Sequence, residues 1–142
     1  MICAWNKFLE ILPSRLMQEV NSIGKEKLME LRMRKGSLAE LKLPSGVYRI
    51  GQRVTEEELE HCVNAASQYS PWASTSISKG YLTAPGGHRI GICGDAIVKD
   101  GVMTGVKNIR SLCIRIARDF PGIAAKAGKI TDSTIIIGAP GW

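Results

Sequence analysis

The sequence predicts an α+β fold, in which helices cover a mixed or antiparallel sheet. Apolar residues recur at helical spacing within residues 1–23 and 55–68. They alternate with charged or small residues over residues 29–34, 39–43 and 112–117, as in strands with one buried face. Short turns rich in Gly, Pro and Ser between the strands favour antiparallel pairing.

The N-terminal segment predicts helices. Phe8 and Leu12 lie in one apolar stripe, Pro13 interrupts it, and Leu16 and Val20 continue an apolar stripe after it.

Three strands are then expected. The alternating runs at residues 29–34 and 39–43 form an antiparallel pair around Lys35-Gly36-Ser37, and a third strand is predicted over Val47–Ile50.

Two central helices are expected, over Thr55 to Gln68 and over Ser70 to Lys79. Thr55 and Glu58 have the spacing of a capping box. In the second helix Ser70 is the N-cap, and Pro71 takes the first helical position, where a missing N–H does no harm.

The second half of the chain returns to strands, over residues 81–84, 88–98 and 112–117. Asp100-Gly101 predicts a tight hairpin. Gly91 and Gly94, inside a strand, indicate a bulge or a close approach of another backbone segment. The longest strand is expected to present four apolar residues on one face: Ile90, Ile92, Ala96 and Val98.

Four parts are expected along the chain. Residues 1–53 form a helical and strand subdomain, and residues 54–120 form an α/β body. Residues 121–132 are a linker with a short helix from Ile123 to Lys129, and residues 133–142 begin a further domain with a strand.

Composition limits the functional classes. With 142 residues, 44% hydrophobic and 23% charged, the chain has the profile of a globular domain without a membrane span or signal peptide. The net charge of +6 suits an anionic partner, and equally suits solubility alone. Cys3, Cys62, Cys93 and Cys113 have no zinc spacing and are expected to be buried, reduced thiols.

No complete catalytic set is present. The two histidines do not assemble a triad with any serine motif, and the acidic run Glu56-Glu57-Glu58 lies where it complements a helix dipole. Function is therefore expected to come from binding by this chain or from what would follow Trp142.

Two features are candidates for binding an anion. Gly138, Ala139, Pro140 and Gly141 follow three isoleucines and match the first part of the phosphate-binding loop G-x-x-x-x-G-K-[ST]. The second feature is a group of arginines on or beside the predicted strands, which can bind phosphate or simply remain solvated or paired with acids: Arg89, Arg110, Arg115 and Arg118.

The runs GGHRIGICG and NIRSLCIRIAR, followed by IIIGAPG, closely resemble stage III sporulation protein AA, a family of ring-forming ATPases related to secretion and type IV pilus motors. The resemblance implies an N-terminal domain of a cytoplasmic hexamer at the mother-cell membrane, with a role in the channel between mother cell and forespore. The implied partners are further copies of the same protein and membrane proteins of that channel.

By the same resemblance, ATP and Mg²⁺ belong to the full-length protein, whose loop continues with Gly, Lys and Thr. This chain alone needs no cofactor and is expected to hydrolyse no ATP. Arg89, Arg115 and Arg118, with Arg110 behind them, are implied to reach the nucleotide of a neighbouring subunit. Nucleic-acid binding and a pure protein-interaction role are the alternatives, the first disfavoured because aromatic residues are only 6% of the chain.

Overall fold

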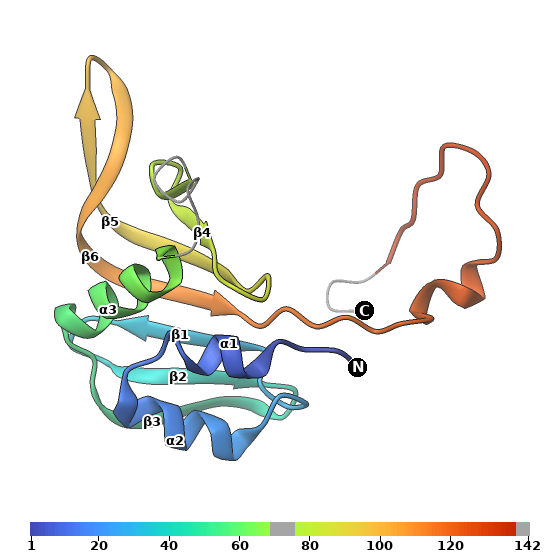
Figure 1. The fold of residues 1–142 in the computed structure, drawn as a ribbon, viewed down its shortest axis with the longest axis horizontal. Coiled ribbons are helices and arrows are strands. Elements are labelled where there is room, and N and C mark those ends of the chain that lie inside the picture. Colours follow the sequence, from blue (N-terminus) through green and yellow to red (C-terminus); the bar gives the residue numbers. More distant parts are fainter. Residues whose placement is uncertain (69–75, 139–142) are drawn as a thin grey trace.

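The computed structural model describes residues 1–68 and 76–138, and these form a six-stranded sheet with helices on one side (Figure 1). The strands are β1 (Glu30–Arg34), β2 (Leu38–Leu43), β3 (Gly46–Arg53), β4 (Tyr81–Thr83), β5 (Arg89–Lys99) and β6 (Val102–Arg115). Their order across the sheet is β3-β2-β1-β6-β5-β4, and all neighbours are antiparallel. The α+β prediction is confirmed, with an antiparallel rather than a mixed sheet.

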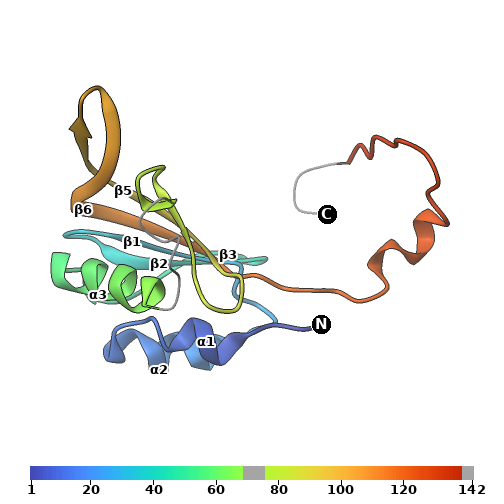
Figure 2. The same ribbon diagram turned by 45° about the horizontal axis from the view of Figure 1, so that its top comes forward.

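The helices α1 (Trp5–Leu9), α2 (Ser14–Ile23) and α3 (Glu56–Ser67) lie beneath the same face of the sheet (Figure 2). Pro13 immediately precedes α2, as its fixed φ allows. The predicted capping box is confirmed: the Thr55 hydroxyl accepts from the Glu58 N–H, and the Glu58 carboxylate accepts from the Thr55 N–H. Most of the predicted helix from Ser70 to Lys79 lies outside the described residues.

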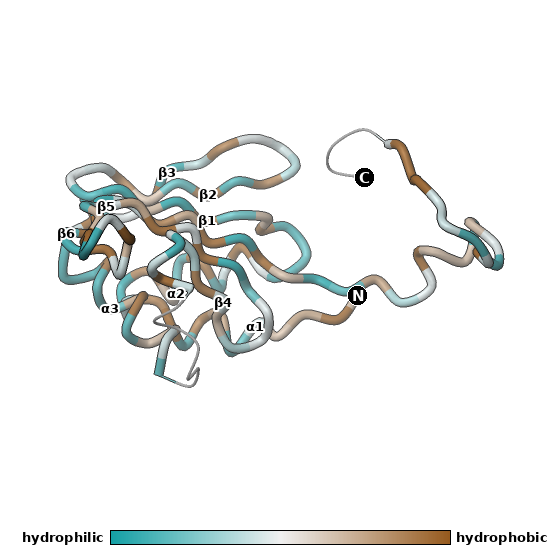
Figure 3. The backbone as a smooth tube through the Cα atoms, turned by 90° about the horizontal axis from the view of Figure 1, so that it is seen from above, coloured by the Kyte–Doolittle hydropathy of each residue, from teal (hydrophilic) through white to brown (hydrophobic). Residues whose placement is uncertain are grey.

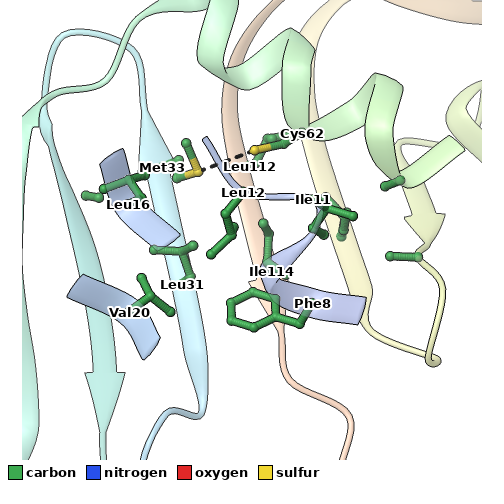
Figure 4. Close-up of a cluster of buried hydrophobic side chains, with 14 of the residues drawn as sticks. Phe8, Ile11, Leu12, Leu16, Val20, Leu31, Met33, Cys62, Leu112 and Ile114 are labelled. Carbon is green, nitrogen blue, oxygen red and sulfur yellow. Dashed lines mark hydrogen bonds between the residues drawn. The ribbon is translucent and has the colours of Figure 1, made fainter. Parts of the chain in front are cut away.

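The core lies between this helical layer and the sheet (Figure 4). Leu31, Met33, Leu112 and Ile114 alternate with exposed residues on β1 and β6 and point towards the helices. Because β1 and β6 are adjacent, residues on either side of the predicted boundary at residue 53 share one sheet and one core.

The hairpin of β5 and β6 differs in part from its prediction. Its turn at Asp100-Gly101 is confirmed, and both residues have positive φ, as the tightest hairpins require. However, the register shifts at Gly94, so Ile90 and Ile92 are buried whereas Val98 is 60% exposed. The predicted single apolar face was wrong, because the outer half of the hairpin projects beyond the helical layer (Figure 1).

Gly94 has the role predicted for it. A Cβ there would lie 2.7 Å from the Lys107 carbonyl oxygen, so the β6 backbone approaches too closely for a side chain. The prediction for Gly91 was wrong, because Gly91 pairs regularly with Cys113 and a Cβ added to it would have no contact closer than 3.9 Å.

Beyond β6 the chain leaves the sheet as a tail (Figure 3). It contains a 3₁₀ helix at Ile123–Ala127, within the predicted short helix. The strand predicted after residue 132 does not form within the described residues, since residues 133–138 have no neighbouring strand to bond with. The isoleucines at 135, 136 and 137 are 88%, 79% and 92% exposed.

Candidate anion-binding face of the sheet

The face of the sheet opposite the helices carries no helix among the described residues (Figure 2), and we call it the open face. It is rich in arginine. Directly opposed residues in antiparallel strands share a face, so the register identifies its members. The exposed basic side chains on it are Arg32, Arg34, Lys42, Arg49, Arg53, Arg89 and Arg115. The acidic residues on it are Glu30, which is buried, and Glu40.

Arg89 and Arg115 are directly opposite each other in neighbouring strands. Arg115 stands between the buried Ile114 and Ile116, which places its side chain on the open face as the alternation predicted. Among the described residues, neither guanidinium has an ion-pair or hydrogen-bond partner. Like charges in direct opposition destabilise a sheet unless an anion lies between or above them.

The acids of this face are already engaged. Glu30 lies opposite Arg115 in the register, but its carboxylate accepts from Arg32. Burial tends to raise the pKa of Glu30, but hydrogen bonds from Arg32 and Cys113 outweigh it, so the pKa is lowered and the carboxylate stays ionised. Glu40 pairs with Arg49 at 3.2 Å.

The other two predicted arginines lie elsewhere and have partners. Arg110 pairs with Asp95 at 3.0 Å, and the Asn108 amide and Arg110 together lower the pKa of that carboxyl. Arg118 donates to the backbone carbonyls of Glu26 and Leu28, both at 3.0 Å. The structure therefore brings together Arg89 and Arg115 and separates Arg110 and Arg118 from them.

Of the predicted phosphate-loop residues, only Gly138 lies within the described part of the chain, at the end of the tail. Ala139, Pro140 and Gly141 lie outside it.

Arg32, Arg34, Arg49 and Arg53 were not singled out from the sequence. The alternation in residues 29–34 did place Arg32 and Arg34 on the polar face of a strand. Only the pairing of β2 and β3 brings Arg49 and Arg53 onto that same face.

The cysteine prediction holds only in part. All four thiols are free, but Cys93 and Cys113 are exposed on the open face. Cys62 is buried against Met33, and burial raises its pKa to about 12, so it is unreactive. The described residues contain no cluster of three or more His, Cys, Asp or Glu side chains that could hold a metal. They also contain no helix with the length and apolarity that a bilayer crossing requires.

Fold and face together define a two-layer α+β domain that buries one side of its sheet under helices and presents arginines on the other. Comparison with known families identifies it further. The family described as sporulation stage III, protein AA, matches residues 5–136, and the chain belongs to this family.

A characterised relative is stage III sporulation protein AA of Bacillus subtilis (strain 168), which is 32% identical over 129 residues. The match covers 84% of this chain and 40% of the relative, so the chain spans less than half of that protein's length.

Two solved structures resemble the fold more distantly. The Legionella pneumophila ATPase DotB has 16% identity and a TM-score of 0.46, with 81% of this chain and 31% of that chain covered. The VirB11 ATPase from the Brucella suis type IV secretion system, solved with sulphate, has 18% identity and a TM-score of 0.43, covering 79% of this chain and 35% of its own.

Proposed function

We propose that this chain is the N-terminal domain of a hexameric sporulation ATPase, and that Arg89 and Arg115 contact ATP bound by a neighbouring subunit. Membership of the sporulation stage III protein AA family supports the setting. The ATP and Mg²⁺ would be held by the part of the protein that follows this domain.

The observation that carries the proposal is the direct opposition of Arg89 and Arg115 across β5 and β6. Two unpaired guanidinium groups on adjacent strands form a preorganised site for a polyanion. Arginine supplied by a neighbour stabilises charge in phosphoryl transfer and can be worth about 10³–10⁵ in rate. Strands hold these side chains more rigidly than loops do, which favours such a positioning role.

In the cell, the assembled protein would act on the cytoplasmic side of the mother-cell membrane and contact membrane proteins of the channel to the forespore. Membership of the family supports this proposal, and so does the basic open face, which suits an acidic surface or partner.

The test is Arg115→Ala and Arg89→Ala in the full-length protein, with Lys99→Ala at the hairpin turn as a charge-matched control. Assembly is measured by light scattering and turnover by phosphate release. We expect intact assembly and at least about a tenfold loss of turnover in the two arginine variants only. Turnover unchanged from the control would overturn the nucleotide role.

Mixed rings test action between subunits. Arg115→Ala subunits are combined with subunits whose ATPase core is inactivated but whose Arg115 is intact. Recovered turnover in the mixture supports contact from a neighbour, whereas no recovery assigns Arg115 to its own subunit.

A further inference from the structure

A groove of about 610 Å³ lies on the open face of the sheet and is lined by residues of β1, β2, β3, β5 and β6. Its charged lining residues are Arg32, Arg34, Arg49 and Arg53, with one acid, Glu40, and none of the arginines at positions 89, 110, 115 and 118 lines it. We propose that this groove binds an acidic, carboxylate-rich segment of a protein partner. The site is distinct from the proposed nucleotide contact.

Small residues make the floor of the groove. Gly91 lies opposite Cys113, and Cys93 lies opposite Ser111, so four adjacent positions on this face have little or no side chain. The fold does not require glycine at position 91. A Cβ there would meet only Cys113 atoms at 3.9 Å, an ordinary contact, and the backbone there does not have the positive φ that favours glycine. The missing side chain therefore leaves space above the sheet.

The arginines around this floor have donors left to offer. The Arg34 guanidinium has no ion-pair or hydrogen-bond partner among the described residues. Arg53 donates to the Gly36 carbonyl oxygen, and Arg49 pairs with Glu40 through one nitrogen. Arg32 already donates to Glu30 through Nε. Since each guanidinium carries five N–H donors, all four arginines keep N–H groups that no described residue accepts.

The chemistry of the walls favours carboxylates. Arginine forks match carboxylate and phosphate oxygens in pairs, which lysine cannot do. Phosphate sites usually add backbone N–H groups from a helix N-terminus or loop. A sheet face offers none, because the ladders use those groups. Binding must therefore come from side chains alone. Arg32 and Arg34 lie about 7 Å apart along β1, which matches the spacing of carboxylates on alternate residues of an extended segment.

A protein segment suits the shape as well. Among the described residues, the open face carries no second layer of the kind that most sheets have, and a partner segment would supply one. Leu38 borders the groove and is 37% exposed, which gives an apolar contact beside the charges.

The probe is a fluorescein-labelled octaglutamate peptide, and binding to the 142-residue chain is followed by anisotropy at low and physiological salt. We expect Arg34→Ala and Gly91→Val each to weaken binding by about fivefold or more, the second without any change of charge. Gly91→Ala adds one methyl group, and Lys99→Ala removes a charge outside the groove, so both should bind within about twofold of the unchanged chain. Circular dichroism establishes that each variant is folded.

Three results would overturn the proposal. The peptide fails to bind the unchanged chain, or Lys99→Ala weakens binding as much as Arg34→Ala, or Gly91→Val has no effect although it is folded. An eight-nucleotide oligothymidylate serves as competitor. If it binds more tightly than octaglutamate, the groove is a nucleic-acid surface and the proposal is wrong.

Discussion

The buried His88 ring accepts the Ala117 N–H at Nδ1 over 3.1 Å, and this bond ties the end of β6 to the start of β5. Its Nε2 faces the Ala4 carbonyl oxygen at 3.0 Å, so the ring proton lies on Nε2. Ile2 and Asp119 exchange two backbone hydrogen bonds beside it, at 2.7 and 2.8 Å. One side chain thus fastens the N-terminal residues and the exit of the sheet together, just before the tail.

His88→Ala should lower the free energy of unfolding by about 3 kcal/mol, because it leaves a cavity and two backbone groups without partners. Urea denaturation measures the effect. His61→Ala, on the exposed side of α3, is the matched control and should change stability by less than about 0.5 kcal/mol. Equal effects from the two variants would show that the His88 bonds contribute nothing.

The free energy of unfolding should fall in acid, because the contact between α2 and α3 includes an ion pair with a carboxylate. Arg15 donates to both carboxylate oxygens of Glu58, and this hydrogen bonding lowers the pKa of Glu58. Since the fold favours the ionised carboxylate, the contribution is present above the ordinary glutamate pKa of about 4.3 and is lost as the pH falls through the lower folded value.

Glu58→Gln should therefore be less stable than the unchanged chain at pH 7, with a difference that shrinks towards pH 3. Glu60→Gln, an exposed residue of the same helix without an ion pair among the described residues, should show no such convergence. Parallel stability curves for Glu58→Gln and the unchanged chain would contradict the assignment.

Gly51 carries two constraints at once, a positive φ of 69° and a close neighbour. A Cβ there would lie 2.8 Å from Nη1 of Arg15, a buried nitrogen without a hydrogen-bond partner in the described residues. Gly101 has a φ of 76° with open space around it. A substitution there therefore measures the cost of the backbone conformation alone. Each change to Ala should cost about 1 kcal/mol from φ alone, and Gly51→Ala should cost measurably more in thermal or urea unfolding. Equal losses would show that Arg15 moves aside freely.

The local elements of this fold could be predicted from the sequence because their signals are local. The capping box at Thr55, the hairpin turn at Asp100 and the alternation around Arg115 each depend on neighbours within a few residues. The order of the strands cannot be predicted from such local signals, because β1 pairs with β6 through a core that distant segments of the chain share. For this reason the sequence grouped Arg118 with Arg115, although the Arg118 partners lie 92 and 90 residues away in the chain. The groove could not be predicted from the sequence for the same reason, because it exists only once β1, β3 and β5 share a face.

Replacing Arg115 or Arg118 by Ala in the 142-residue chain should therefore have opposite effects on the free energy of unfolding. Arg118→Ala removes two charge-assisted hydrogen bonds to backbone carbonyls and should lower the free energy of unfolding by about 1–3 kcal/mol. Arg118→Lys should recover only part of this loss, because one ammonium group does not reproduce the fork that spans the Glu26 and Leu28 carbonyls.

Arg115→Ala removes a charge that opposes Arg89 directly, so stability should stay unchanged or rise by a few tenths of a kcal/mol. Urea denaturation at low and high salt measures both variants, and any gain for Arg115→Ala should shrink as salt screens the repulsion. A loss as large as that of Arg118→Ala would mean that Arg115 already has a stabilising partner inside the domain. The opposition of the two arginines would then no longer indicate a site for an anion from outside.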